Sequence, residues 1–407
     1  MNGMDDMSPP SRPPSSRRTG PASVPPPPTF EREIGRAVGV RSGPTLVVVA
    51  AIHGNEQAGI GAARRVVDIL CRKDVSLRGE LVAIAGNVGA IRQGKRYELR
   101  DLNRVWTEEK VAALEARIAK DEPLDAEENE QRQILSAVRA AIGRAKGQVF
   151  LVDLHTTSAH GVPFVLFGDT LAQRAFVSDL PLPVVMGLEE QVDGVLSSYW
   201  TRNGCITFAV EGGQHHDSAS VDNLAAVLLL AAESAGLFPR DTIAETKSAR
   251  ELLEKRRGDL PRVMEVVSRH AIHPDDAFTM EPGFKNLDHA RASQLLARDR
   301  NGEIRAPRDG LVMLPLYQKQ GDDGFFWGRA VSSARLRASK ALRHLSIDRF
   351  FDLLPGVARD KAHPSRFIVD RSIARIYPLG VFHMLGYRRI REHGESPRQL
   401  TVERQPD

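Results

Sequence analysis

The stretch VVVAAIHGNEQAG, residues 47–59, places two chemically active side chains where a buried strand is predicted to end. Its apolar run stops at His53, and Gly54, Asn55 and Glu56 follow before a helical pattern begins. The i, i+3 spacing lets His53 and Glu56 face one point, and Gly54 relieves crowding where the backbone bends. Alone, a His-x-x-Glu is more often a surface turn than a ligand pair, so further residues have to support it.

Two other apolar runs also end in a histidine or a glutamate. The run VFLVDLH delivers His155, and CITFAVEGG delivers Glu211. In a parallel sheet, ligands bind beyond the carboxyl ends of the strands, so these side chains are expected to meet. Two imidazoles and one carboxylate (His53, His155, Glu56) are the ligand set of a catalytic zinc, and a further carboxylate can take the proton of a water. Asp153 is expected to steady a ligand from behind.

A second group of polar residues lies in KRYELRDLNR, residues 95–104. Arg96, Arg100, Asn103 and Arg104 fall within one loop, and arginine binds carboxylates through two parallel hydrogen bonds. One interpretation is a site for an anionic substrate. The other is a structural basic loop tied to local acids such as Asp101, and the pattern leaves both open.

Composition narrows the class of protein. The chain has 407 residues, 42% hydrophobic and 27% charged, and no run approaches the roughly 18 apolar residues of a membrane span. Its two cysteines, Cys71 in a helical pattern and Cys205 in a strand-like one, exclude a disulfide framework and a thiolate zinc site. We expect a reducing, cytoplasmic setting.

The pattern of predicted strands and helices changes along the chain. Strand and helix patterns alternate first, which predicts an α/β domain with a mostly parallel sheet, and short strand-like pieces punctuated by Gly, Pro and Asp follow. The expected divisions are a disordered Pro-rich leader at 1–30, an α/β domain at 31–240, a helical linker at 241–261, a β-domain at 262–330 and a basic extension at 331–407.

The basic character is concentrated near the C-terminal end. Residues 331–391 carry 13 Lys/Arg against 4 Asp/Glu, although the net charge of the whole chain is only +4. Such a run is more often a solvated face than a binding surface, so no nucleic-acid partner is expected. The sequence leaves a homo-oligomer open.

The motifs HGNE, RYELRDLNR, DLH and VEGG, in this order and spacing, resemble the succinylglutamate desuccinylase and aspartoacylase family over about residues 44–330. The resemblance implies a zinc-carboxypeptidase-like mixed sheet flanked by helices, with a smaller C-terminal β-barrel-like domain covering the pocket. It also implies one zinc per chain, held by His53, Glu56 and His155.

The resemblance assigns further roles residue by residue. Glu211 matches the catalytic base and acid, and Arg96 matches the residue that polarises the scissile carbonyl. Asn103 and Arg104 match the residues that hold the substrate's carboxylate.

Two positions depart from the family pattern. Aspartoacylases carry another arginine shortly before the catalytic glutamate, and here Thr201 occupies that spacing while Arg202 follows it. Arg202 is therefore a substrate-binding candidate only if the family position is shifted by one residue in this chain. Tyr317 is a candidate for a family tyrosine that reaches the pocket from the β-domain.

The leading hypothesis is a zinc-dependent deacylase that cleaves the amide bond of an N-acyl amino acid or a related small, anionic acylated amine. A zinc carboxypeptidase acting on short peptides and a non-catalytic ligand-binding relative are the alternatives. A carrier domain suggested by GEIRAPRDGLVMLPL is excluded, because the expected turn around Met313 has no lysine to modify.

Overall fold

The computed structural model describes residues 31–318, 320–345, 347–361, 363–370, 372–373, 379–390 and 399–404. The predicted disordered leader at 1–30 lies outside the described residues, as do parts of the predicted extension.

The centre of the described structure is one eleven-stranded mixed sheet with the order β1-β3-β2-β4-β7-β5-β6-β8-β14-β13-β10. Neighbours from β3 to β7 run parallel, β5 runs antiparallel to β7, and β6 and β8 continue parallel to β5. The strands are β1 Glu33–Val38, β2 Arg41–Ala50, β3 Arg78–Ala85, β4 Val149–Thr157, β5 Phe164–Phe167, β6 Val184–Met186, β7 Ile206–Gln214, β8 Val263–Ala271, β10 Asp288–Ala290, β13 Gly310–Met313 and β14 Asp323–Ala330.

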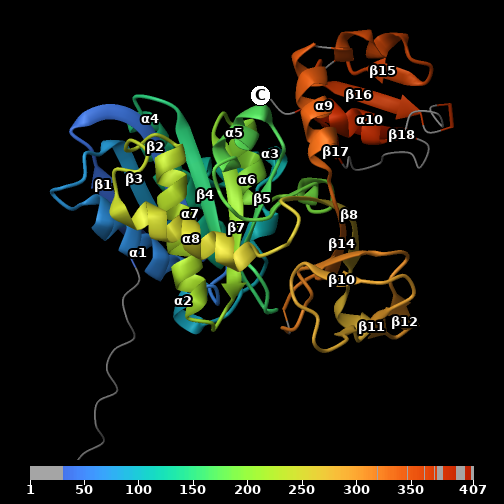
Figure 1. The fold of residues 1–407 in the computed structure, drawn as a ribbon, viewed down its shortest axis with the longest axis horizontal. Helices are drawn as coiled ribbons and strands as arrows, with labels where there is room; N and C mark the ends of the chain where they lie inside the picture. The colour runs from blue at the N-terminus through green and yellow to red at the C-terminus, as the bar shows by residue number, and fades with distance from the viewer. Residues whose placement is uncertain are drawn as a thin grey trace, which may run out of the picture.

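Helices cover both faces of this sheet, because its central strands are apolar on both sides. Alternate residues of β2 divide between two cores: Val48 packs with α1 and α7, whereas Val47 and Val49 pack with α3, α4 and α6. Figure 1 shows α7 and α8 in front of β4 and β7. The helices are α1 Ala58–Leu70, α2 Val88–Gln93, α3 Glu108–Ala119, α4 Ala126–Arg144, α5 Leu171–Val177, α6 Leu196–Arg202, α7 Ala219–Ser234 and α8 Ala244–Arg257, with 3-10 turns η1 Leu102–Arg104 and η2 Leu188–Glu190.

The region after α8 is mainly β structure. Strand β8 joins the main sheet beside β6, and β14, β13 and β10 extend it, so this region is continuous with the α/β part (Figure 1). A separate three-stranded sheet packs beside it, formed by β9 Thr279–Met280, β11 Leu295–Asp299 and β12 Gly302–Arg305, near the turn η3 Pro274–Asp276. The predicted α/β class with a smaller C-terminal β region is confirmed, whereas the exact domain divisions stay predictions.

The predicted basic extension contains a further small sheet with the order β15-β16-β18-β17. Its own core gathers Phe351, Phe367, Phe382 and Tyr387 between the sheet and the helices. The elements are α9 Ser333–His344, η4 Ile347–Leu353, β15 Val357–Arg359, β16 Arg366–Asp370, α10 Leu379–Met384, β17 Tyr387–Ile390 and β18 Gln399–Arg404.

Two smaller predictions also have a structural counterpart. Cys71 follows α1 and is exposed, Cys205 is buried just before β7, and both thiols are free. Within the described part of the chain, every helix is too short or too polar to cross a membrane.

Candidate active site

The turn after β2 brings His53 and Glu56 together. The backbone NH of Glu56 donates to the carbonyl of His53 at 3.0 Å, which closes the turn. Gly54 approaches the backbone of α2 so closely that a Cβ on it would lie 2.2 Å from the carbonyl carbon of Ala90. The glycine is therefore required for close packing, and the crowding expected from the sequence is present.

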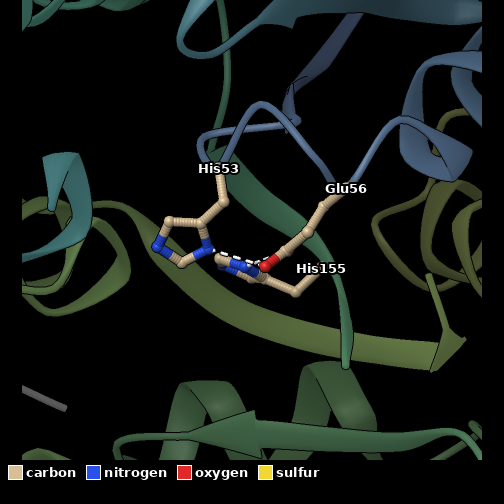
Figure 2. A group of neighbouring side chains, drawn as sticks. All are labelled: His53, Glu56 and His155. Atoms are coloured by element: carbon tan, nitrogen blue, oxygen red, sulfur yellow. Dashed lines mark hydrogen bonds and ion pairs between the residues drawn. The ribbon is translucent and has the colours of Figure 1, made fainter. Parts of the chain in front are cut away.

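His155 lies on the neighbouring strand β4 and points at the same carboxylate. Nδ1 of His53 is 2.8 Å from Oε1 of Glu56, and Nδ1 of His155 is 3.0 Å from Oε2 (Figure 2). The backbone NH of Thr156 also donates to Oε2 at 3.1 Å. One potential ligand atom from each of the three side chains lies within 4.8 Å of the others, and all three side chains are buried.

The far nitrogen of each imidazole faces a second carboxylate. Nε2 of His53 is 3.0 Å from Oδ1 of Asp101, and Nε2 of His155 is 2.9 Å from Oδ2 of Asp153. The second contact is ionic rather than a well-aligned hydrogen bond, since neither oxygen of the buried Asp153 has a hydrogen-bond partner among the described residues. Asp101 and Asp153 thus hold the two rings so that both Nδ1 atoms point at Glu56. Metal-binding histidines are usually oriented by a carboxylate in this way. The donor set therefore fits a metal ion.

Burial and charge act in opposite directions on the two carboxylates of the site. Burial alone would raise the pKa of Glu56, but the charge of His53 and hydrogen bonds from both rings outweigh it and hold the pKa well below its usual range. Glu211 pairs in register with His155 across β4 and β7. Its burial raises its pKa to about 8, and its Oε2 is buried with no hydrogen-bond partner among the described residues. Glu211 is thus free to exchange a proton.

The arginine loop contributes to the same site through Asp101. Nη2 and Nε of Arg96 donate to Oδ2 of Asp101 at 3.0 and 3.2 Å, and Nη1 lies 3.4 Å from Oε1 of Glu56. Asp101 therefore joins Arg96 to His53. The sequence suggested Asp101 as a structural partner of the arginine loop. In the structure, Asp101 also contacts His53, a candidate metal ligand.

Asn103 and Arg104 line the same cavity but already have partners in the chain. The side-chain oxygen of buried Asn103 accepts a hydrogen bond from the backbone NH of Leu196 at 2.8 Å, at the start of α6. Nη2 of Arg104 donates to Oδ2 of Asp323 on β14 at 2.7 Å. Arg100 points elsewhere and pairs with Asp125 at the start of α4.

The structure does not bring Arg202 and Tyr317 into the cavity. Arg202 lies at the end of α6, 39% exposed, with Nη2 3.5 Å from Glu403 of the extension. The preceding residue, Thr201, does line the cavity. Tyr317 is exposed, and its hydroxyl donates to the carbonyl of Glu281 at 2.8 Å.

Two residues that the sequence did not single out also line the site, and so does His215, one of three histidines near these loops in the sequence. Asp323 and Gln318 come from the β region, and Gln318 lies 3.1 Å from Nε2 of His215. His215, which follows the VEGG motif, also contacts Thr156 at 2.7 Å, whereas His160 and His216 do not line the cavity. The sequence could not reveal the β-region contacts, because they join segments more than a hundred residues apart.

The side chains that line the site surround one cavity with an empty volume of about 1100 Å³, including the space at its mouth. The α/β part supplies the metal-site residues, and the β region supplies Leu314, Pro315, Leu316 and Phe326. The β region therefore forms part of the cavity wall. Together, the mixed sheet and this site define an α/β protein with a candidate metal centre in a deep cavity.

Comparison with known proteins shows which family the α/β part of the chain is similar to. Residues 42–232 match the family model "Succinylglutamate desuccinylase/Aspartoacylase catalytic domain". A succinylglutamate desuccinylase of Burkholderia thailandensis is 26% identical over 261 residues, 63% of this chain and 70% of that protein. One of Erwinia tasmaniensis is 39% identical over 61 residues, which span only 15% of this chain and 18% of its own.

Solved structures agree on the fold. A succinylglutamate desuccinylase/aspartoacylase of Rhodobacter sphaeroides has 18% identity and a TM-score of 0.53, covering 72% of this chain and 87% of its own. The ectoine utilization protein EutE of Ruegeria pomeroyi has 21% identity and a TM-score of 0.51, with the same coverage of 72% and 87%. Over residues 42–232 the chain is thus similar to the succinylglutamate desuccinylase/aspartoacylase family, whose names denote hydrolytic deacylases.

Proposed function

We propose that the protein is a zinc-dependent hydrolase that cleaves the amide bond of an N-acyl amino acid or a related small acylated amine. The observation that carries this proposal is the convergence of two imidazole Nδ1 atoms on Glu56, with Glu211 on the adjacent strand. His53, Glu56 and His155 would hold the zinc. When bound, zinc lowers the pKa of a water toward about 7 and polarises a carbonyl oxygen.

Glu211 is the residue that moves the proton. Its Oε2 has no hydrogen-bond partner among the described residues, and a zinc cation nearby would favour the ionised form of the carboxyl, which can accept a proton from the attacking water. As the water oxygen bonds to the amide carbon, Glu211 holds that proton. It returns the proton to the amine nitrogen as the carbon–nitrogen bond breaks, which leaves a carboxylic acid and a free amine.

Arg96 is placed to stabilise negative charge on the carbonyl oxygen. Asp101 fixes the guanidinium by accepting hydrogen bonds from its Nε and Nη2, and the Arg96 side chain still lines the cavity. Burial would lower the pKa of Arg96, but the charges of Asp101 and Glu56 outweigh it and raise that pKa, so the cation is retained. A fixed cation acts on developing charge without reorganisation.

The cavity favours a small substrate over a peptide. Residues of the β region line it, as Leu316 and Phe326 show, so the site is covered rather than an open groove. This feature disfavours the carboxypeptidase alternative. A carboxylate on the substrate would bind at Asn103 and Arg104, where it would compete with Asp323 for the guanidinium.

The decisive experiment follows release of free amine from N-acyl amino acids by zinc-loaded protein. Wild type is expected to release amine, and Glu211→Gln is expected to lose at least about 100-fold in turnover while it keeps zinc and fold, because an amide cannot accept the proton. Metal content and circular dichroism serve as controls. Absence of amine release by wild type, or near-normal turnover by the zinc-loaded variant, would contradict the proposal.

A further inference from the structure

The cavity extends well beyond the metal-site residues, along one face of β7. Thr207, Ala209 and Glu211 all line it, as the alternation of a strand requires, while Phe208 and Val210 belong to the opposite core. Thr207 lies four positions before Glu211 on the strand, a span of about 13 Å. The cavity therefore has an inner part far from the reacting atoms.

The walls of this inner part are apolar. Leu166 of β5 pairs directly with Ala209, and Val192 and Phe326 pack into the same cluster. All four side chains line the cavity. We call the space between these walls and Thr207 the inner pocket; it suits an extended chain of methylene groups.

The floor of the inner pocket is polar, neutral and closed on itself. Nε2 of Gln173 donates to the hydroxyls of Thr201 and Thr207 at 3.1 and 3.2 Å. Those hydroxyls each lie within hydrogen-bond distance of the carbonyl of Ser197, at 2.9 and 3.0 Å. An amide has two N–H donors and a hydroxyl has one, so the donors of these three side chains are already used.

These three side chains would consequently offer a substrate carboxylate no free donor. Arg96 and Arg104 are the arginines among the described residues that line the cavity, and each already pairs with a carboxylate of the chain. Burying an anion without a donor or a cation is costly. Thr201, near the end of α6, belongs to this neutral network.

One acidic side chain lines the cavity at the same end. Glu189 follows β6, which runs parallel to β5, so it lies at the end of the sheet where β5 reaches Phe167 and Gly168. Its Oε1 is buried and has no hydrogen-bond partner among the described residues; Nε of Arg388 lies 3.8 Å away. Oε1 of Glu189 can accept a hydrogen bond, whereas the donors of Gln173, Thr201 and Thr207 are already used.

We propose that the inner pocket receives an extended aliphatic chain of the substrate whose tip is an ammonium group that pairs with Glu189, and that it rejects a carboxylate tip. The inference rests on the proposed deacylase function and narrows its substrate class. Burial raises the pKa of Glu189 to about 7, although the charge of Arg388 opposes this rise, so an incoming cation would favour the ionised form. An anionic group nearer the metal site remains compatible with the pocket.

The test measures binding by calorimetry to zinc-loaded Glu211→Gln protein, so that it does not depend on turnover. One arm varies the amine half, with Nα-acetyl-lysine, Nα-acetylnorleucine and Nα-acetyl-2-aminoadipate. The other varies the acyl half, with 6-aminohexanoylglycine, hexanoylglycine and adipoylglycine. Within each arm, the compounds have the same number of chain carbons and end in an ammonium, methyl or carboxylate tip.

In at least one arm, the ammonium tip is expected to bind at least about tenfold more tightly than the carboxylate tip, with the methyl tip between them. Adding Glu189→Gln should reduce binding of the ammonium tip to the level of the methyl tip. The matched control, Glu190→Gln, should keep the order, because Glu190 bonds to His383 and Arg388 of the extension.

A carboxylate tip that binds as well as the others in both arms, a preference unaffected by Glu189→Gln, or no binding at all would overturn the inference. Failure of the proposed function looks different. In that case the binding order would hold, but wild-type protein would release no amine from any of the six compounds.

Discussion

At the scale of single residues, Asp101 explains why the arginine loop and the His53 turn belong to one site. One oxygen faces His53 and the other holds Arg96, so the two groups that the sequence suggested separately are joined by one side chain. Burial would raise the pKa of Asp101, but the charges of Arg96 and His53 outweigh it and keep the pKa well below its usual range. The carboxylate therefore stays ionised between the two.

The arginines of this loop are predicted to differ in what they do. Arg96→Ala should lower kcat, by about 2.7–4 kcal/mol of barrier if it acts like other oxyanion donors, because its charge matters most in the transition state. Arg104→Ala should mainly raise KM, since a substrate carboxylate is present in both ground and transition states. Steady-state kinetics on the proposed substrates measures both.

Arg100→Ala is the matched control, because this arginine lies in the same loop but pairs with Asp125 and is half-exposed. It should leave both parameters near their wild-type values. Equal effects of all three substitutions would mean that the loop has a purely structural role.

Replacing a metal ligand is predicted to remove zinc, whereas replacing a nearby histidine is not. His155→Ala should lose bound zinc in elemental analysis, because it removes one of three ligands. His216→Ala is the control, since this exposed side chain is near the site in sequence but does not line the cavity. Full zinc occupancy in His155→Ala would refute the ligand assignment.

At the scale of elements, the sequence predicts strands well where an apolar run ends in a polar residue. The runs that end near His53, His155 and Glu211 are neighbouring parallel strands, β2, β4 and β7, as the argument from strand ends required. The pairing of β8 with β6 was not visible, because the sequence shows that a strand exists but not which distant strand it meets.

Side-chain direction on a short helix is also hard to read from sequence. Thr201 and Arg202 are adjacent on α6, and successive helical residues point about 100° apart, so only Thr201 faces the cavity. A shift of one residue in a motif therefore cannot be assumed to preserve a role. Tyr317 lies in a loop, where no periodic pattern fixes the direction of its side chain.

The turn between β2 and α1 gives a prediction about an element. Gly54→Ala should destabilise the protein by about 1–3 kcal/mol and weaken metal binding, because a Cβ would overlap backbone atoms of Ala90 and displace His53 and Glu56. Thermal unfolding and zinc affinity measure the two effects.

The matched control is Gly61→Ala in α1, where the nearest atom to a new Cβ is Cγ1 of Val221 at an ordinary 3.5 Å. Replacing a helical glycine by alanine should stabilise the protein by about 0.5–1 kcal/mol. If both variants behave alike, close packing at Gly54 is not what holds the turn.

At the scale of the whole molecule, the extension is joined to the α/β part by buried ion pairs. Arg388 of β17 donates to Asp169 at 2.7 Å and to Glu190 at 3.0 Å, and Arg343 of α9 donates to Asp169 at 2.6 Å. In Figure 1 the extension is the red module beside the β region. Asp169 and Glu190 are next in sequence to cavity-lining residues, so the joint supports the cavity wall from behind. The basic run predicted as a solvated face is thus partly buried.

His383 makes this joint sensitive to pH. Its two ring nitrogens lie 3.2 Å from Glu265 and 3.0 Å from Glu190, with Arg388 beside them. Burial would lower the pKa of His383, but the hydrogen bonds to Glu190 and Glu265 outweigh it and raise that pKa. The pKa of Glu265 falls to about 2 and that of Glu190 is also lowered, so both partners stay ionised around neutral pH. Of His383 and its two carboxylate partners, only the imidazole titrates near neutrality.

The sign of the effect follows from the raised pKa. A group with a higher pKa in the folded than in the unfolded state stabilises the fold fully below its unfolded value, about 6.5 for histidine, and loses that contribution as pH rises through the folded value. Wild type should therefore exceed His383→Gln in melting temperature most at pH 6, and the difference should shrink as pH increases above the raised pKa. Thermal unfolding of both proteins in matched buffers from pH 6 to 9 measures it. Titrations elsewhere in the molecule largely cancel between the two proteins, so a difference that stays constant or grows with pH would show that the imidazolium does not hold the extension in place.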